Sequence, residues 1–126
     1  SLEKLIKKYE IDTIYTHWAG DSNQDHIATF KTTMAAARYV PNVFCYEQIP
    51  IPRHTENPMA INYYSDITET FDNKIKASKC HKSQFVKYKK AGFDVAKNLK
   101  IIAQYRGIEA NCKYAEGFHI IKTVVK

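Results

Sequence analysis

Two histidines and two aspartates fall within ten residues near the amino end of the chain, in the segment HWAGDSNQDH at residues 17–26. Imidazole and carboxylate groups are common zinc ligands and common proton carriers in hydrolysis. Residues 11–16, just before this segment, have the β-branched and aromatic content of a short buried strand. Residues 27–38, just after it, repeat apolar side chains at three- and four-residue spacings, which predicts a helix. Open α/β sheets build their sites between the end of a strand and the start of a helix. We therefore expect a site here.

The rest of the chain predicts alternating helices and strands. Ser22 and Asp25 have the spacing of a capping box, which places the start of the second helix near Ser22. The other predicted elements are a helix over residues 2–9, strands over 43–46, 60–64 and 115–121, a helix from Thr68 or Thr70 to about Gln84, and a helix over 93–106 closed by Gly107. Residues 47–60 carry three prolines and predict a surface loop, and residues 85–92 look basic and irregular. This order predicts an α/β class, specifically part of a Rossmann-like, doubly wound layered fold with a short, mostly parallel sheet and flanking helices.

Length and composition limit the number of domains and the kinds of protein that this chain can represent. The 126 residues, 44% of them hydrophobic, predict a single domain over residues 1–126 with enough apolar material for a core. The net charge of +6 owes much to seven lysines between residues 74 and 90, a run typical of a solvated helix face. The sequence contains no recognised nucleic-acid-binding motif, and it has no apolar stretch long enough to predict a membrane span. Three widely spaced cysteines without a metal-binding pattern, and no signal peptide, favour reduced thiols in a cytoplasmic protein.

Several short blocks together resemble one enzyme family. The blocks are NQDHIAT at residues 23–29, an Ala-rich helix ending in Arg38, SDITET at 65–70, HKSQ at 81–84, Arg106-Gly107, and YAEGF at 114–118. In this order they are similar to the PIG-L/LmbE-type deacetylases. That resemblance implies a zinc hydrolase that removes N-acyl groups, mostly from N-acetylglucosamine units.

The family's first motif, His-Pro-Asp-Asp-Glu, has no match in the chain. In the family it supplies a zinc-binding histidine and aspartate and the base that activates water. The resemblance therefore implies that the chain corresponds to the carboxyl-terminal half of such a deacetylase domain. The missing amino-terminal half of the same fold would be its partner.

The resemblance assigns roles to residues in the first block. His26 is the implied zinc ligand. Asn23 stands where the family often has a histidine, so it can stabilise an oxyanion by hydrogen bonding but cannot transfer a proton. Asp25, which orients that histidine in the family, is left to fix the tautomer of His26 or His17. His17 is the nearest replacement acid, and the alternative is that it packs against Trp18 or bonds the backbone.

Three further residues are expected to bind substrate. Arg53 lies in the proline-rich loop, and the resemblance implies the same role for Tyr114 and Glu116, which fall where the family brings a polar strand toward the substrate. An ion pair of Glu116 with Arg106 is the structural alternative for that carboxylate. Asp66 either orders active-site loops or stabilises its own turn.

The sequence thus predicts a zinc-dependent hydrolase that, in an intact parent protein, removes the acetyl group from an N-acetylated amino sugar such as an N-acetylglucosamine conjugate. We expect the 126-residue chain alone to be inactive, because the base and two of three zinc ligands are missing. The alternative is a non-catalytic module that binds a glycan or a protein. Association into a homo-oligomer is left open.

Overall fold

The computed structural model describes residues 1–49 and 55–126, and the chain divides into two compact units. Unit 1 comprises Ser1–Tyr63 and Phe118–Lys126, and unit 2 comprises Tyr64–Gly117. The single domain over residues 1–126 that length alone suggests stays a prediction.

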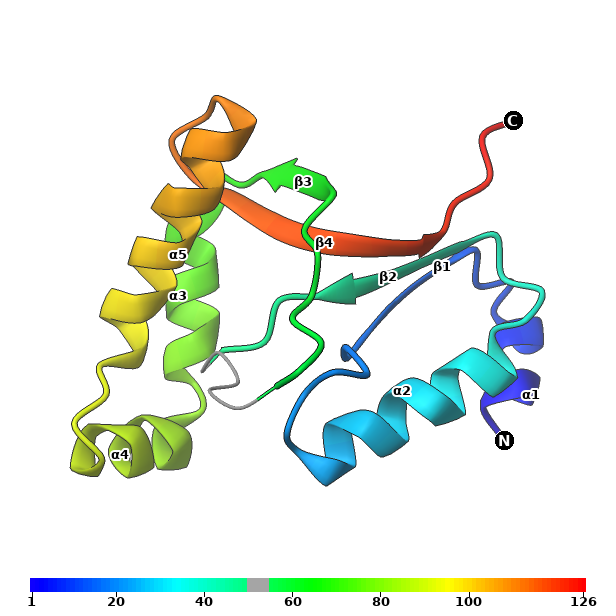
Figure 1. Cartoon of the computed structure of the whole chain (residues 1–126), viewed down its shortest axis with the longest axis horizontal. Coiled ribbons are helices and arrows are strands. Elements are labelled where there is room, and N and C mark those ends of the chain that lie inside the picture. Colours follow the sequence, from blue (N-terminus) through cyan, green and yellow to red (C-terminus); the bar gives the residue numbers. More distant parts are fainter. Residues whose placement is uncertain (50–54) are drawn as a thin grey trace. The chain divides into compact units, whose positions relative to one another are not determined.

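Within the described residues, the chain forms five helices and a four-stranded mixed sheet of order β1-β2-β4-β3 (Figure 1). The elements are α1 (Leu2–Lys8), β1 (Thr13–Thr16), α2 (Gln24–Ala36), β2 (Asn42–Tyr46), β3 (Tyr63–Asp66), α3 (Phe71–Lys79), α4 (Lys82–Lys90), α5 (Val95–Ala110) and β4 (Ala115–Lys122). Strands β1 and β2 are parallel, whereas β2 and β4 are antiparallel. The predicted α/β class is confirmed. The sheet is mixed rather than mostly parallel, and the Rossmann-like winding stays a prediction.

In unit 1, α1 and α2 cover one face of the β1–β2 pair. Side chains alternate between the faces of a strand, so Ile14 and Val43 point to the same side. They pack there with apolar residues from both helices and from the turn after α2, namely Ile6, Met34, Ala37 and Val40. On the same side, the Thr16 hydroxyl donates a hydrogen bond of 3.1 Å to the Thr33 hydroxyl of α2. These contacts fix the start of α2 beside the end of β1.

The other face of the same strands carries aromatic rings. Tyr15 lies over Phe44 with ring centroids 5.5 Å apart, and over Phe118 at 5.4 Å. Tyr63 extends this layer, 4.9 Å from Phe44. Phe44 and Phe118 are buried, but Tyr15 is 55% exposed and Tyr63 is 42% exposed. Unit 1 therefore has one helix-covered face and one half-exposed aromatic face.

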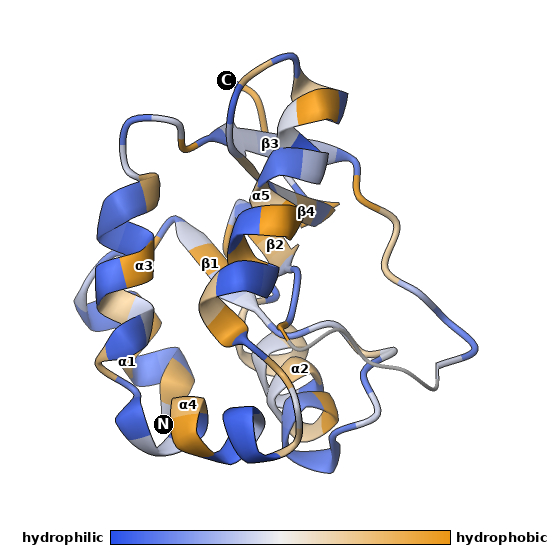
Figure 2. Ribbon diagram, turned by 90° about the vertical axis from the view of Figure 1, so that its left-hand side faces the viewer, coloured by the Kyte–Doolittle hydropathy of each residue, from blue (hydrophilic) through white to orange (hydrophobic). Residues whose placement is uncertain are grey.

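In unit 2, α3 and α5 lie side by side (Figure 1). Their core contains Ile67, Phe71, Ala103 and Tyr114, and the rings of Phe71 and Tyr114 stack with centroids 4.0 Å apart. Blue and orange residues share the surface of α3 in Figure 2, as expected of a helix with one buried side.

Two helix boundaries differ from the sequence predictions. The cap of α2 is Asn23 rather than Ser22, and its side chain accepts hydrogen bonds from the amides of Asp25 and His26. The helix predicted to run to Gln84 ends at Lys79, and α4 begins at Lys82 after His81 leaves the helical conformation. Residues 85–90, predicted to be irregular, belong to α4, because α4 packs on α5. This contact between distant segments overrides the local pattern.

Gly107 does not close α5, contrary to the sequence prediction. The helix continues to Ala110, and Asn111 takes the left-handed conformation at its end, with φ 58°. Gly107 is needed for space instead. A Cβ atom there would lie 2.5 Å from the carbonyl oxygen of Cys112 and 2.7 Å from that of Lys113.

The remaining strands follow their predictions with small shifts. Strand β2 and strand β4 confirm the predicted strands over 43–46 and 115–121. The strand predicted over 60–64 appears as β3, three residues later. The carboxylate of Asp66 accepts hydrogen bonds from the amide and hydroxyl of Thr68, so this aspartate stabilises its own turn.

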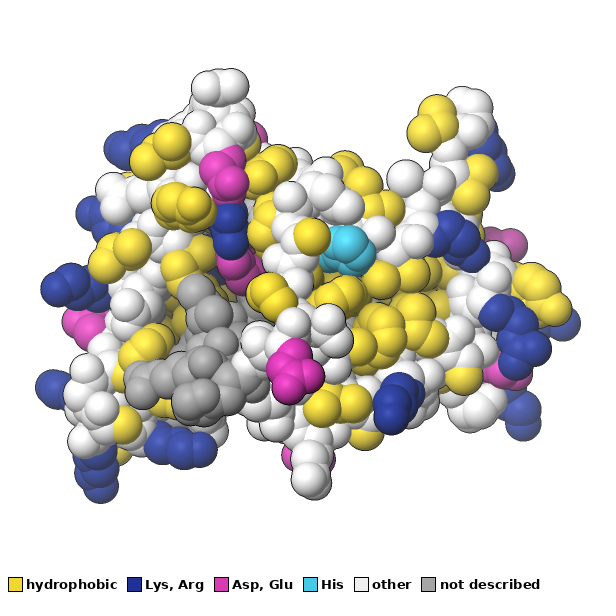
Figure 3. Space-filling view, viewed as in Figure 1, with side chains coloured by type: hydrophobic (Ala, Val, Ile, Leu, Met, Phe, Trp, Pro, Cys, Tyr) yellow, Lys and Arg dark blue, Asp and Glu magenta, His cyan; other side chains and the backbone are white. Residues whose placement is uncertain are grey.

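The lysine run predicted to be a solvated face is exposed at six of its seven positions, whereas Lys74 is half-buried and pairs with Glu116. Lys76, Lys79, Lys82, Lys87, Lys89 and Lys90 are exposed. On the face drawn in Figure 3, dark-blue Lys and Arg side chains are spread over the molecule rather than gathered in a single patch. Among the described residues, none of the helices has the length and apolar character needed to cross a membrane.

Candidate metal site

Three side chains from the sequence-predicted site lie together in unit 1. His17 directly follows β1, Asp21 lies in the connecting turn, and His26 is in the first turn of α2. Each contributes one potential ligand atom, and these atoms lie within 4.8 Å of one another. Because β1 and α2 are held together by the buried core between them, the histidines are placed by the fold.

Asp21 is buried and holds His26 in one orientation. One carboxylate oxygen, Oδ2, lies 2.7 Å from Nδ1 of His26. The other oxygen, Oδ1, accepts a hydrogen bond of 2.9 Å from the backbone amide of Asn23. Burial favours protonation, but the bonds from Asn23 and His26 prevail and lower the pKa of Asp21 below its usual value. An ionised Asp21 is a hydrogen-bond acceptor, so in the neutral ring it favours the tautomer with Nδ1–H toward Asp21, which has its lone pair on Nε2.

His17 lies flat against His26. The two imidazole rings are 3.9 Å apart between centroids and differ by 5° in plane. Nε2 of His17 lies 2.9 Å from the Tyr46 hydroxyl, while Nδ1 is buried and has no hydrogen-bond partner among the described residues. Burial, followed by the neighbouring imidazole of His26, lowers the pKa of His17, opposed by Asp21 and Gln48. His17 is thus a mainly neutral imidazole at neutral pH.

The three side chains form a possible metal site in which the donors are not equivalent. A metal-bound histidine commonly gives its second nitrogen to a carboxylate, as His26 does to Asp21. Each oxygen of Asp21 takes part in one hydrogen bond, so Asp21 orients His26, and its carboxylate keeps lone pairs that make it a potential ligand as well. A histidine binds a metal ion in the plane of its ring. Because the two rings are stacked in parallel planes, one ion cannot lie in both, so His17 can bind the ion held by His26 only if its ring rotates. The site presents one oriented ligand, His26, and one unsatisfied buried nitrogen, Nδ1 of His17.

Asn23 and Asp25, both predicted to act in catalysis, serve the helix start in this structure. The side-chain oxygen of Asn23 caps α2 through the amides of Asp25 and His26, at 2.9 and 3.4 Å. The Asp25 side chain is exposed, and the contact expected from it, a carboxylate on His26, is made by Asp21. Catalytic roles for Asn23 and Asp25 stay predictions. Sequence reasoning gave Asp21 no role. Its position two residues before a helix-capping Asn was the available signal.

A second segment, residues 55–57, closes against the turn that carries Asp21. The indole nitrogen of Trp18 donates a hydrogen bond of 2.7 Å to the carbonyl oxygen of Asn57. The Thr55 hydroxyl donates to the carbonyl oxygen of Gly20. A Cβ atom on Gly20 would lie 2.1 Å from the Asn57 carbonyl oxygen, so only glycine permits this approach. The predicted surface loop is therefore bonded, at residues 55–57, to the turn between β1 and α2 that carries Asp21.

The residues predicted to bind substrate lie elsewhere in the chain. Arg53 falls outside the described residues. Tyr114 is buried against Phe71 in unit 2, and Glu116 pairs with Lys74 rather than with Arg106, the partner expected from sequence. Arg106 pairs with Glu109 at 2.7 Å. Substrate-binding roles for these residues stay predictions.

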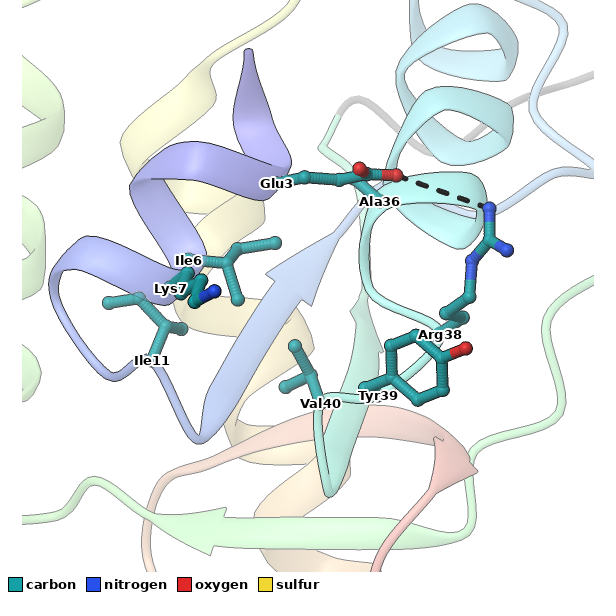
Figure 4. A pocket seen from close by; sticks show the side chains of 8 residues that line it. All are labelled: Glu3, Ile6, Lys7, Ile11, Ala36, Arg38, Tyr39 and Val40. Carbon is teal, nitrogen blue, oxygen red and sulfur yellow. Dashed lines mark ion pairs between the residues drawn. The ribbon is translucent and has the colours of Figure 1, made fainter.

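A pocket of about 540 Å³ lies between α1 and the end of α2, away from the predicted site residues (Figure 4). Its floor is apolar, with Ile6, Ile11 and Val40, and its rim carries a 4.0 Å ion pair between Glu3 and Arg38. Both partners of that pair are largely exposed, so the pair contributes little to stability.

Comparison with known proteins points toward deacetylases. The chain is 34% identical over 88 residues to a protein of Escherichia coli (strain K12) named uncharacterized deacetylase YaiS, a match covering 66% of this chain and 46% of YaiS. The match thus spans less than half of that relative. No family model matches the chain.

A solved structure shares the fold. It is the crystal structure of the conserved protein TT1542 from Thermus thermophilus, with a TM-score of 0.74 and 22% identity. The similarity covers 99% of this chain and 58% of the other. At that identity the likeness establishes the fold alone. The chain is a distant relative of a protein named a deacetylase, and it shares an α/β fold with the structural neighbour.

Proposed function

We propose that this chain is the carboxyl-terminal portion of a zinc-dependent deacetylase that removes the acetyl group from an N-acetylated amino sugar. The observation that carries the proposal is the Asp21–His26 pair, at 2.7 Å, on the turn between β1 and α2. It is a histidine oriented by a carboxylate, at the strand-to-helix position where α/β sheets build sites. The similarity to YaiS supports the choice of deacetylation among hydrolytic reactions.

In the proposed reaction, the residues of this chain bind the metal, orient its ligand and donate a proton. When bound, zinc would polarise the acetamide carbonyl and lower the pKa of a bound water to about 7. His26 would hold the ion through Nε2, and Asp21 orients the ring by accepting a hydrogen bond from Nδ1–H. His17, stacked on His26, would deliver a proton to the departing amine or turn to bind the ion. Residues 55–57 lie against one side of the turn between β1 and α2.

The remaining ligands and the base lie outside this chain in the proposal. One oriented histidine does not hold zinc, because hydrolytic zinc sites use three protein ligands. We therefore assign the activity to an intact parent protein.

The test is metal retention and acetate release by the intact protein with His26→Ala. Loss of one of three ligands should remove most bound zinc after dialysis, together with turnover of an N-acetylglucosamine conjugate. His81→Ala is the matched control, because His81 is exposed in unit 2, and it should retain metal and turnover. Full zinc occupancy in the His26 variant would remove the basis of the proposal. Zinc retention without acetate release by the unmutated protein would favour the non-catalytic glycan- or protein-binding alternative.

A further inference from the structure

We propose that Tyr46 is a positioning residue that decides the role of His17: its hydroxyl holds the imidazole stacked on His26, in an orientation that does not bind the metal ion. The inference rests on the proposed function for the reaction in which His17 takes part. The contact itself, between the end of β2 and the residue after β1, lies within unit 1.

Strand pairing brings Tyr46 to His17. Thr16 is in register with Cys45 in the parallel β1–β2 pair. The next residue is His17 on one segment and Tyr46 on the other, so these two lie beside each other. Nε2 of His17 lies 2.9 Å from the Tyr46 hydroxyl, and the two rings meet edge to face with centroids 4.9 Å apart. The Cys45 thiol donates a hydrogen bond of 3.4 Å to the carbonyl oxygen of His17. The end of β2 therefore fixes both the backbone and the ring of His17.

The hydroxyl also selects the tautomer of the ring. Within the described residues, Nδ1 of His17 is buried and has no hydrogen-bond partner, so the bond at Nε2 decides which nitrogen carries the proton. Burial raises the pKa of Tyr46, so its phenol stays protonated and is able to donate or accept this bond. Gln48 also acts on the imidazole, but its side-chain nitrogen donates to the Ile49 carbonyl oxygen at 3.2 Å.

The orientation that Tyr46 holds keeps His17 off the metal ion of His26. The two imidazole rings lie in nearly parallel planes with centroids 3.9 Å apart, so His17 must rotate before it becomes a ligand. Rotation breaks the bond to Tyr46 and leaves a half-buried hydroxyl without that partner, which costs free energy. Tyr46 therefore opposes ligation by His17 and leaves this imidazole available for proton transfer.

A merely structural role for Tyr46 makes the opposite prediction. If the hydroxyl only stabilised the end of β2, its loss would loosen the turn that carries the site and weaken metal binding. If it restrains His17, its loss frees a second ligand and strengthens metal binding. The direction of the change in metal affinity therefore distinguishes the two roles.

The first test observes the His17 ring without metal. The imidazole nitrogens of the 126-residue chain are measured by ¹⁵N NMR in EDTA, at about pH 7.5. We expect one tautomer of His17 in the unmutated chain and a shifted tautomer population in Tyr46→Phe, which keeps the aromatic ring and removes the hydroxyl. Tyr63→Phe is the matched control, because it removes a hydroxyl from a ring that lies beside Phe44 in the same unit. The same tautomer population in Tyr46→Phe as in the unmutated chain would overturn the proposal.

The second test is the zinc affinity of the same chain, measured by titration calorimetry. Tyr46→Phe removes the bond that rotation of His17 has to break, so zinc should bind about two- to tenfold more tightly, the range for one hydrogen bond. Tyr63→Phe should bind zinc as the unmutated chain does. The gain should be absent when Tyr46→Phe is introduced beside His17→Ala and compared with His17→Ala alone. Equal or weaker affinity of Tyr46→Phe, or a gain that persists without His17, would refute the restraint.

These readouts are independent of the reaction. Neither test contains a substrate, so the restraint on His17 stands or falls whether or not the intact protein releases acetate. Conversely, failure of both tests would leave the comparison of His26→Ala with His81→Ala, and with it the proposed function, unaffected.

Discussion

At the residue scale, the arrangement of three side chains decides what this turn can do. Asp21 is the residue that the structure adds. Its carboxylate, and not that of Asp25, meets Nδ1 of His26, because the turn curls back before α2 begins. A charge-assisted hydrogen bond of this kind fixes both the ring orientation and the tautomer of a ligand.

Substitution of Asp21 should therefore weaken metal binding. In the intact protein, we expect Asp21→Asn to lower zinc affinity about 10- to 100-fold, the usual effect of losing a residue that orients a metal-binding histidine. Asp25→Asn is the matched control, since that carboxylate is exposed on the same turn. Zinc affinity measured by competition with a chelating dye distinguishes the two. Equal affinity of both variants would show that Asp21 has no part in binding metal.

His17 is the other residue with a defined consequence. If it donates the proton to the leaving amine, His17→Ala in the intact protein should reduce turnover by about 10²–10⁴-fold while zinc content stays full. Burial and His26 lower the pKa of His17, so its protonated fraction falls as pH rises, starting below the usual histidine range. The rate should therefore decline on the high-pH side in the unmutated protein, and this decline should vanish in the variant.

A structural role for His17 predicts another outcome. The ring packs on His26 and bonds Tyr46, so its removal would then lower the thermal stability and leave the shape of the pH–rate profile unchanged. Turnover measured against pH for both proteins, beside a thermal melt, separates the two roles.

At the element scale, the caps and the close approaches position these residues. Asn23 begins α2 and so sets the rotation at which His26 faces Asp21. In unit 2, the chain turns back after α5, and the backbone of residues 112–113 passes so close to Gly107 that it leaves no room for a side chain there. This approach leads the chain into β4, which pairs with β2.

Gly107→Ala should thus be destabilising although alanine favours helices. The added Cβ atom would lie 2.5–2.7 Å from two backbone carbonyl oxygens, and backbone cannot move aside cheaply. We expect a loss of about 1–3 kcal/mol in the free energy of unfolding, the range for forced overpacking. Ala110→Gly, at the last position of the same helix, is the comparison for propensity alone. Urea denaturation of both variants checks the expectation, and unchanged stability of the Gly107 variant would contradict the close approach.

At the scale of the whole molecule, the candidate metal site lies within unit 1. The Asp21–His26 pair and the half-exposed aromatic face both belong to this unit.

The 126-residue chain alone should consequently lack deacetylase activity. Added zinc would meet one oriented ligand and no water-activating base from the family's first motif, which the chain lacks. Acetate release from N-acetylglucosamine conjugates, measured with and without zinc, checks this expectation, with the intact protein as the positive control. Turnover by the short chain at the rate of the intact protein would show that its own residues complete the site.

The sequence by itself determined the features that depend on local pattern. Periodicity and β-branched content located α1, β1, β2 and β4, and the polar segment between β1 and α2 marked the candidate site. Motif order pointed to a deacetylase, and His26 was named from it. The elements depend on neighbouring residues, and the resemblance depends on the order of short blocks along the chain.

Tertiary structure decided what depends on residues distant in sequence. The break between α3 and α4 follows from packing on α5, and Gly107 lies inside α5 because a later segment crosses it. Asp21 rather than Asp25 orients His26, since the path of the turn selects which carboxylate arrives. Stacking of His17 on His26 depends on the core that fixes α2 against β1. Local patterns record propensity, but they do not encode which distant surfaces meet, because that choice is made by burial and close packing in the folded chain.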